Sequence, residues 1–420
     1  MNIQILDRLA VMWGKRPAGE LALDRNGAMQ FAYAQSWLRD PQALPLSFLL
    51  PLRAEPFEDR ACKPFFENLL PEEWQREAAA RALGISAGNP FRLLQALGGD
   101  TAGALTFWPA DQPMPFGSSV SAPVPLNDAE LAALFDRLGQ RPMLAGEGTR
   151  YSLAGAQSKL PVVLIDNRIA LASPGQATTH IIKPEPARFP GLAANEAFCM
   201  ALAKSIGLAA ADAEWRFAGG RAFLLVSRYD RITQNGPVRR LHQEDFAQAL
   251  GVMSSRKYAS DGGPVFRDCF DLVRRATTNP ETEVLKLIDA ALFNLIIGNA
   301  DAHAKNFSLL RKANGEVALA PLYDLVSTIG WPELSSRFAM KYGQAKKLED
   351  MSIGSFERFA ADGGVDLEMV RVRGLSFCER IMLGLEMGLD TPGLTDRSAV
   401  SALAALIHDR AGRISLKLAG

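Results

Sequence analysis

The sequence contains few of the residues that build disulfide scaffolds or zinc sites. Its 420 residues include four cysteines and four histidines, and no Cys-x-x-Cys pair occurs. Because structural zinc sites take closely spaced cysteine and histidine ligands, this scatter predicts no zinc site. Scattered cysteines are also typical of proteins from reducing compartments. We therefore expect a cytoplasmic protein rather than a disulfide-stabilised secreted domain.

An excess of charge of one sign is also missing. The chain has 46 Lys and Arg residues against 46 Asp and Glu residues, so its net charge is 0. Such a chain has no long-range field for nucleic acid or anionic membrane, so DNA binding would need a local patch or a partner protein. The most apolar run, Ala290–Gly298, is far shorter than the ~20 residues of a membrane-spanning helix. Met1–Pro17 carries Asp7 within its apolar stretch and lacks a signal-peptide layout, so no membrane association is expected.

Composition and length predict a globular chain with more than one structural unit. Hydrophobic residues make up 48% of the sequence and charged residues 22%, close to the average of soluble globular proteins. At roughly 100–200 residues per domain, the length indicates two or three units. We expect a β-rich N-terminal module over residues 1–110, a proline-rich linker over 111–128, a second β-rich region over 129–230 and a helical region over 231–420.

Residue patterns support this α+β organisation. Apolar and polar residues alternate on either side of Asn26-Gly27, which is a strong hairpin signal because both turn positions tolerate positive φ. Asp166-Asn167 marks a second hairpin. The expected strands are Ala18–Asp24, Ala28–Ala34, Ala102–Trp108, Leu160–Ile165, Ile169–Ala172, His180–Lys183 and Arg221–Val226. The expected helices are Glu72–Leu83, Asp128–Leu138, Ala194–Ile206, Gln243–Leu250, Val265–Arg275, Glu281–Ile297, Ser355–Ala361 and Ala399–Leu418.

The polar segment after the helix Glu281–Ile297 carries the pattern with the most specific chemistry. Asp301 precedes Asn306 by five residues, which is the spacing of a kinase catalytic loop. In such a loop Asp301 would accept the proton of an attacking hydroxyl, and Asn306 would offer a carbonyl oxygen to Mg²⁺. Lys305 would neutralise charge on the γ-phosphate. The alternative is a polar loop that only ends the preceding helix, since short spacings recur by chance.

A second acid follows further along the chain. Asp324 ends the segment Pro321-Leu322-Tyr323-Asp324, after the hairpin-like Asn314-Gly315. Kinases place a metal-binding Asp at the end of such a hairpin, where its carboxylate holds the Mg²⁺ that neutralises phosphate oxygens. The alternative role for Asp324 is the N-cap of a helix over Leu325–Ile329.

Three earlier segments match the remaining parts of a phosphotransferase in the expected order. The small-residue loop Ser152–Lys159 precedes a strand and would bring backbone N–H groups to phosphate oxygens. Lys183 ends a strand upstream of a helix that opens with Glu196, so Lys183 would hold phosphates and Glu196 would orient it. Ser227–Asp230 follows a strand and would form the hinge that binds adenine. The alternatives are an ordinary turn, a solvated surface lysine and a routine strand end.

Taken together, these segments resemble the HipA toxins, which are serine/threonine kinases of bacterial type II toxin–antitoxin modules. The resemblance spans nearly the whole chain. The matching segments are FFENLLP (Phe65–Pro71), GGDTAGAL (Gly98–Leu105), SLAGAQSK (Ser152–Lys159), THIIK (Thr179–Lys183), NEAFCMALAKSIGL (Asn195–Leu208), LVSRYDR (Leu225–Arg231), QEDFAQALG (Gln243–Gly251), KYASDGGP (Lys257–Pro264), GNADAHAKNFS (Gly298–Ser308) and APLYDLVS (Ala320–Ser327).

The resemblance implies a bilobal protein-kinase-like fold with a β-rich N-terminal module and a helical C-terminal lobe. It implies that Asp301 is the catalytic base and that Asn306 and Asp324 hold Mg²⁺. The implied ATP-binding residues are Ala154, Gly155, Ala156, Gln157, Ser158 and Lys159 of the phosphate loop, then Lys183, the hinge residues Ser227, Arg228 and Tyr229, and finally His303, Lys305, Asn306, Tyr323 and Asp324. Ser152 matches the family's autophosphorylated serine, where a phosphate would repel ATP or displace the loop. Ser158 and Ser227 stand where relatives can carry acidic residues, so Ser227 is expected to contact adenine through its backbone.

The resemblance also implies partners. We expect a HipB-like helix-turn-helix antitoxin dimer, operator DNA bound through that antitoxin, and a protein substrate such as an aminoacyl-tRNA synthetase. Arg371, Arg373 and Arg380 are candidates for direct contact with DNA phosphates, with a solvated face as their alternative. The expected function is an ATP- and Mg²⁺-dependent protein serine/threonine kinase that arrests growth. The alternatives are a small-molecule kinase of the same fold and a non-catalytic corepressor that binds the antitoxin.

Overall fold

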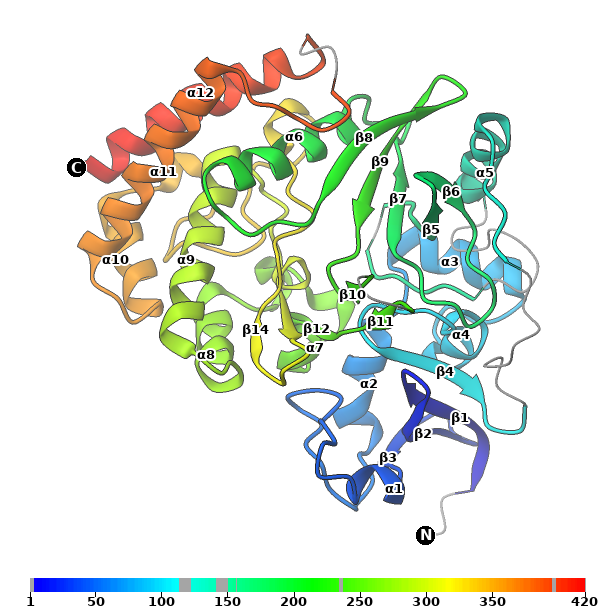
Figure 1. The fold of residues 1–420 in the computed structure, drawn as a ribbon. Helices are drawn as coiled ribbons and strands as arrows, with labels where there is room; N and C mark the ends of the chain where they lie inside the picture. Colours follow the sequence, from blue (N-terminus) through cyan, green and yellow to red (C-terminus); the bar gives the residue numbers. More distant parts are fainter. Residues whose placement is uncertain are drawn as a thin grey trace. The chain divides into compact units, whose positions relative to one another are not determined.

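The computed structural model describes residues 4–112, 122–140, 150–155, 157–233, 237–394 and 398–419, and its elements are labelled in Figure 1. The chain forms two compact units. The first consists of Met1–Pro184, Ala218–Arg221 and Asp230–Ser254, and the second of Glu185–Phe217, Ala222–Tyr229 and Ser255–Gly420. Residues 113–121 of the expected linker lie outside the described part. The division of the chain at residues 110, 128 and 230 stays a prediction.

The first unit begins with a four-stranded antiparallel sheet in the order β3-β2-β1-β4. Its strands are β1 (Ile5–Trp13), β2 (Arg16–Asp24), β3 (Met29–Tyr33) and β4 (Leu105–Pro109). The hairpin at Asn26-Gly27 is confirmed, because β2 pairs with β3 and Gly27 has φ +83°. The sequence analysis did not predict β1, which pairs with both β2 and β4.

Four helices complete this part of the first unit. They are α1 (Gln35–Leu38), α2 (Asp59–Glu67), α3 (Glu73–Leu83) and α4 (Pro90–Leu97). The expected helix Glu72–Leu83 is confirmed as α3. Phenylalanine side chains from the sheet and the helices build the core, among them Phe31, Phe66 and Phe107. Leu153 belongs to the same core, so the segment that carries the expected phosphate loop is anchored in it.

The rest of the first unit contains α5 (Asp128–Gln140), β5 (Leu160–Ile165), β6 (Arg168–Ala170), β7 (His180–Pro184), β10 (Arg231–Ile232), β11 (Arg239–Arg240), β12 (His242–Asp245) and α7 (Phe246–Leu250). Strand β5 pairs antiparallel with β6 and β7. The second hairpin is confirmed, because Asp166 and Asn167 have φ +49° and +62°, as its tight turn requires. The helix expected from Gln243 begins only at Phe246, because Asp245 caps it by accepting a hydrogen bond from Gln248 N.

The second unit is mostly helical. It contains α6 (Leu192–Ser205), β8 (Ala213–Ala218), β9 (Arg221–Ser227), α8 (Phe266–Ala276), α9 (Pro280–Ile297), β13 (Ser308–Arg311), β14 (Val317–Leu319), α10 (Ile353–Asp362), α11 (Leu367–Met387) and α12 (Ser398–Ala419). Helix α9 is buried along most of its length and packs against α8, α11 and α12. It ends at Gly298 in the left-handed conformation, which starts the polar segment with Asp301. In the described part of the chain, no helix has the length and apolar character that a membrane crossing requires.

Candidate active site

The loop that begins at Ser152 is held tightly within the first unit. Ser152 is fully buried. Its hydroxyl donates a hydrogen bond to Leu69 O at 2.7 Å, and its N–H donates to Asp100 O at 3.0 Å. Asp100 N in turn donates to Arg150 O at 2.9 Å. Ser152 therefore lies in a pocket with main-chain partners and no contact with solvent.

The next residues of the loop make a close backbone approach. Gly155 has φ +112°, a conformation that favours glycine because a residue with a Cβ would be strained there. A Cβ at this position would also lie 2.5 Å from Lys159 Nζ, so the lysine end group would have to shift. Lys159 donates to Ala154 O at 2.7 Å and is 6% exposed, so the lysine closes the loop on itself. Glu72 N, at the start of α3, donates to Gly155 O at 3.4 Å. Gln157 and Ser158 are half-buried, and Ala156 lies outside the described residues.

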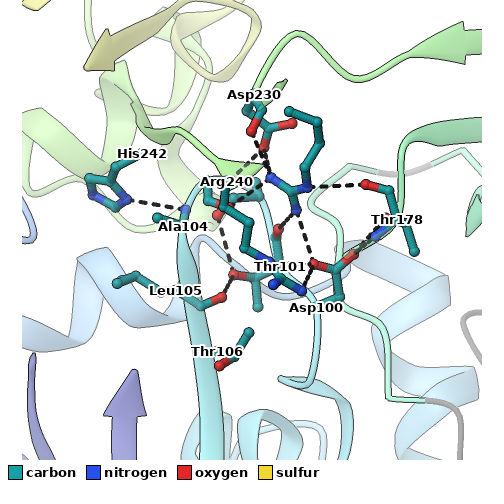
Figure 2. Close-up of polar contacts among 12 residues, drawn as sticks. Asp100, Thr101, Ala104, Leu105, Thr106, Thr178, Asp230, Arg240 and His242 are labelled. Carbon is teal, nitrogen blue, oxygen red and sulfur yellow. Dashed lines mark hydrogen bonds and ion pairs between the residues drawn. The ribbon is translucent and has the colours of Figure 1, made fainter. Parts of the chain in front are cut away.

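Asp100 is the centre of a buried ion-pair network, which Figure 2 shows in close-up. Its Oδ1 accepts hydrogen bonds from Arg231 Nη2 at 3.0 Å and Arg240 Nη2 at 2.9 Å. Its Oδ2 accepts from the main-chain N–H and the hydroxyl of Thr178. Arg231 is also paired with Asp230, and its side chain is completely buried. One carboxylate thus joins the segment before the phosphate loop to the segment that follows the hinge.

Lys183 and Glu196 are both buried, one in each unit. Lys183 lies in β7 and is 5% exposed, so the alternative of a solvated surface lysine is wrong. Glu196 lies in α6 and is 1% exposed. Charged side chains are rarely this buried without a partner. Each of the two residues takes part in at least one hydrogen bond, ion pair, ring contact or electrostatic interaction.

The expected hinge lies at the end of β9 in the second unit. Ser227 N donates to Asp212 O at 2.8 Å, and Arg228 is 6% exposed. Tyr229 stacks on Tyr323 with ring centroids 5.7 Å apart and an interplanar angle of 29°. This contact brings the hinge and the Asp324 segment to the same aromatic pair, as a shared nucleotide pocket would require.

Asn299 links the two expected catalytic acids. Its Oδ1 accepts from Asp301 N at 3.1 Å, and its Nδ2 donates to Asp324 O at 3.4 Å and to Asn294 Oδ1 at 2.8 Å. Asn299 is 7% exposed. The main chains of Asp301 and Asp324 are therefore fixed by one buried amide.

The carboxylate of Asp301 contacts a residue that the sequence analysis did not assign to the site. Tyr258 OH donates to Asp301 Oδ1 at 3.0 Å. The Tyr258 ring also packs edge-on against His303, with centroids 5.4 Å apart. Tyr258 belongs to KYASDGGP, one of the segments that resemble the HipA toxins, and the sequence alone indicates no role for it. The Asp301 carboxylate thus already accepts a hydrogen bond from one hydroxyl group.

Asn306 lies in a 3-10 turn over Ala304–Asn306. Its Oδ1 accepts from His303 N at 3.2 Å, and its N–H donates to His303 O at 2.9 Å. The neighbouring Lys305 is 7% exposed, and its carbonyl accepts from Tyr323 OH at 2.8 Å. This last bond ties the Asn306 turn to the residue directly before Asp324.

Asp324 adopts a backbone conformation that is unusual for its residue type. Its φ is +52°, a left-handed value that costs energy for a residue with a Cβ and marks functional sites when the surroundings enforce it. The N-cap alternative is wrong, because the 3-10 turn that follows spans Thr328–Gly330 and its N-cap is Ser327.

These residues fit a magnesium ion. The Asp324 carboxylate and the Asn306 amide are the hard oxygen ligands that Mg²⁺ takes beside substrate phosphates. An amide oxygen has two lone pairs, so the bond from His303 leaves one on Asn306 Oδ1 for a cation. No group of three or more His, Cys, Asp or Glu side chains suited to a metal occurs among the described residues. A kinase-type site does not need one, because phosphates supply further ligands.

The three arginines considered for DNA contact have protein partners in the second unit. Arg373 forms a two-pronged pair with Asp289 at 2.6 and 2.7 Å. Arg371 donates to Leu418 O at 2.8 Å and Arg380 donates to Ile206 O. Their guanidinium groups are thus engaged in holding helices together.

Known proteins share this sequence and fold. A family model described as the HipA-like C-terminal domain matches residues 151–381, and one described as the HipA N-terminal domain matches residues 9–108. "Putative kinase Y4mE" of Sinorhizobium fredii is 53% identical over 377 residues, covering 89% of both chains. The serine/threonine-protein kinase toxin HipA of Shewanella oneidensis is 33% identical over 338 residues, covering 77% of this chain and 75% of its own.

A solved structure agrees with these matches. HipA of Shewanella oneidensis, in a complex with HipB and its operator DNA, superimposes with a TM-score of 0.83 at 28% identity, covering 96% of this chain and 97% of its own. The fold and the site thus define a kinase with a protein-kinase-like fold. The chain belongs to the HipA family of kinases, which confirms the expected fold class, family and enzyme class.

Proposed function

We propose that this chain is an ATP- and Mg²⁺-dependent protein serine/threonine kinase that arrests growth as a toxin. The observation that carries the proposal is the Asn299 amide, which holds the main chains of Asp301 and Asp324 at 3.1 and 3.4 Å. Phosphoryl transfer depends on positioning and on electrostatic stabilisation rather than on covalent chemistry by the protein. Asp301 and Asp324, whose main chains are held by one amide, meet this requirement.

In this proposal each residue has one role. Asp301 accepts the proton of the attacking hydroxyl, at the carboxylate that Tyr258 contacts at 3.0 Å. Asp324 and Asn306 hold the ion, and Mg²⁺ when bound neutralises charge on the β- and γ-phosphates. Lys305 stabilises the transferred phosphoryl group.

The nucleotide-binding residues of the proposal are those that the family resemblance implies. Lys183 and the loop Ala154–Lys159 bind the ATP phosphates. Ser227–Tyr229 bind adenine, and the Tyr229–Tyr323 stack with His303 lines the pocket. In this proposal residues 129–230 contribute the β-rich lobe, joined by the linker 111–128 to the module 1–110, and residues 231–420 contribute the helical lobe.

Partners and regulation complete the proposal. A HipB-like helix-turn-helix antitoxin dimer neutralises the toxin and carries it to operator DNA, in line with the HipB and DNA in the related Shewanella complex and with the zero net charge of this chain. The substrate is a translation component of the cytoplasm, such as an aminoacyl-tRNA synthetase. Phosphorylation of Ser152 by the kinase itself shuts the enzyme off.

Growth assays and phosphoproteomics test the proposal together. The chain is induced without antitoxin, as wild type, Asp301→Ala, Asp324→Ala and the matched surface control Glu379→Ala. We expect arrest and new phosphoserine or phosphothreonine sites for the wild type and Glu379→Ala, and neither for the two Asp variants. Arrest by folded Asp301→Ala would refute a catalytic toxin, whereas a wild type that neither arrests growth nor labels proteins would support a non-catalytic corepressor. Labelling of small metabolites alone would support a small-molecule kinase.

A further inference from the structure

Helix α6 contacts the Asp324 segment through one fully engaged amide. Asn195 lies on the first turn of α6 and is 5% exposed. Its Nδ2 donates to Ser327 O at 3.0 Å, and its Oδ1 accepts from Ser327 N at 2.9 Å. The side chain therefore binds both main-chain groups of one residue, as a neighbouring strand would.

The orientation of this amide is fixed by its surroundings. Cys199, one turn later on α6, donates its thiol hydrogen to Asn195 Oδ1 at 3.6 Å. Burial raises the pKa of the Cys199 thiol to about 12, so the sulfur keeps its proton and acts as a donor. If the Asn195 amide were flipped, its NH₂ group would face two other donors, the Ser327 N–H and the Cys199 thiol. The observed orientation is thus the one that satisfies the Ser327 N–H, the Ser327 carbonyl and the Cys199 thiol together.

Ser327 is three residues after Asp324, and the chain between them needs outside support. Asp324 has φ +52°, a left-handed conformation that costs energy for residues with a Cβ, although less for aspartate than for most. On its upstream side, Leu322 N donates to Ala209 O at 2.8 Å and Ala211 N donates to Leu322 O at 2.9 Å. On the downstream side, the hydrogen bonds between Asn195 and Ser327 give the corresponding support. Asp324 is therefore held between two fixed points.

The same segment is joined to the catalytic loop. The Thr328 hydroxyl donates to Gly298 O at 2.9 Å and accepts from Ala300 N at 3.1 Å. A shift of Ser327 would therefore move its neighbour Thr328 and, with it, the start of the loop that carries Asp301. The buried Ser327 side chain takes no part, because its Oγ has no hydrogen-bond partner among the residues that the structure describes. Only the main chain of Ser327 is recognised.

From this geometry we infer that Asn195 is a positioning residue, which sets the Asp324 carboxylate for the metal ion by clasping the Ser327 backbone. The inference rests on the proposed function, since it deepens the role of Asp324 there. It gives helix α6 a role at the Asp324 segment, which Asn195 contacts from the first turn of the helix. The position of α6 and the geometry of the metal site are then coupled.

The direct test is metal binding by four variants of the full chain. Asn195→Asp keeps the acceptor for Ser327 N but turns the donor into an oxygen that opposes Ser327 O. Asn195→Ala removes both bonds, and alanine partly offsets the loss because it is the better helix former. Ser327→Ala leaves the clasp intact. Tyr342→Phe removes a buried hydrogen bond to Ala291 O, 2.7 Å long, elsewhere in the same unit.

Mn²⁺ affinity is measured by electron paramagnetic resonance in the presence of a non-hydrolysable ATP analogue. We expect the dissociation constant to rise at least tenfold in Asn195→Asp and Asn195→Ala, with a parallel rise in the Mg²⁺ concentration for half-maximal protein labelling. Saturating Mg²⁺ restores part of the rate. Ser327→Ala and Tyr342→Phe keep wild-type metal affinity, although Tyr342→Phe loses thermal stability.

The outcomes separate failure of this inference from failure of the proposed function. Wild-type Mn²⁺ affinity in a folded Asn195 variant overturns the inference, and if Asn195→Asp does not fold, Asn195→Ala decides. Equal loss of affinity in Tyr342→Phe also overturns it, because a general loss of stability would then explain the effect. A wild-type chain that binds no Mn²⁺–nucleotide and labels no protein refutes the proposed function itself.

Discussion

Phosphorylation of Ser152 is incompatible with the position that this serine occupies. Its side chain is 0% exposed, and its hydroxyl donates to Leu69 O at 2.7 Å. A phosphate on that oxygen removes the donor and places about −1.5 to −2 charges against a carbonyl oxygen. The phosphorylated residue must therefore leave its pocket, and Leu153 and the phosphate loop must leave with it.

The magnitude follows from the contacts. Loss of the donor leaves Leu69 O unsatisfied, which costs about 1–3 kcal/mol. Burial of an unpaired ion adds several kcal/mol more. Even a total of about 4 kcal/mol corresponds to roughly a thousandfold shift in the equilibrium, since each 1.4 kcal/mol is about tenfold. The described loop position is then favoured about a thousandfold less than in the unphosphorylated chain.

Hydrogen exchange and nucleotide affinity measure this shift without phosphorylation. Ser152→Glu introduces a buried carboxylate, Ser152→Ala removes only the hydroxyl, and Ser86→Glu adds the same charge at an exposed serine of the same unit. We expect Ser152→Glu to raise exchange of the amide that donates to Asp100 O at least a hundredfold and to abolish binding of an ATP analogue. Ser152→Ala should change both modestly and Ser86→Glu neither. Equal protection and affinity in Ser152→Glu and Ser152→Ala would refute the reasoning.

Three further predictions concern the buried network, the base and the thiols. Arg231→Met should lower the free energy of unfolding by about 3–5 kcal/mol in urea titrations, because it removes the buried guanidinium that pairs with both Asp100 and Asp230. Arg8→Met, which breaks an exposed pair, should cost at most about 1 kcal/mol. Tyr258→Phe should lower kcat several-fold with little change in KM for ATP, because the hydroxyl that contacts Asp301 at 3.0 Å is lost; a steady-state assay that finds kcat unchanged contradicts this. Burial raises the pKa of all four thiols, which belong to Cys62, Cys199, Cys269 and Cys378. A disulfide reagent at pH 8 should therefore label none of them in the native protein and all four after denaturation. Labelling before unfolding would contradict their buried positions.

Local signals predicted the elements whose boundaries are set by local chemistry. Asn26-Gly27 and Asp166-Asn167 marked their hairpins because those residues adopt positive φ at low cost. Strand β1 and helix α11 were missed. β1 gains its stability from pairing on both edges, which no short window reveals. α11 buries only five of its 21 residues, so its apolar periodicity is weak and its neighbours α9 and α12 decide its conformation.

The candidate site also contains residues that local sequence patterns indicate and residues that they do not. Asp301, Asn306 and Asp324 are predicted to belong to the site because their residue types and spacing are typical of a kinase. Asn195 and Tyr258 were not assigned, because their roles arise from contacts with residues far along the chain. An asparagine inside a helix and a tyrosine in a glycine-rich loop look ordinary in sequence. Only the structure distinguishes a side chain that clasps a backbone from one that faces solvent.

The buried Arg231–Asp100 pair also constrains how the nascent chain acquires its structure. Its two residues are 131 positions apart, and the first unit incorporates Asp230–Ser254. When translation has passed only the N-terminal sheet, Asp100 lacks the cations that compensate its burial. At about 5–20 residues per second, that incomplete state lasts on the order of ten seconds. A truncated gene product that stops before Arg231 would remain in that state permanently, and quality-control proteases should remove it.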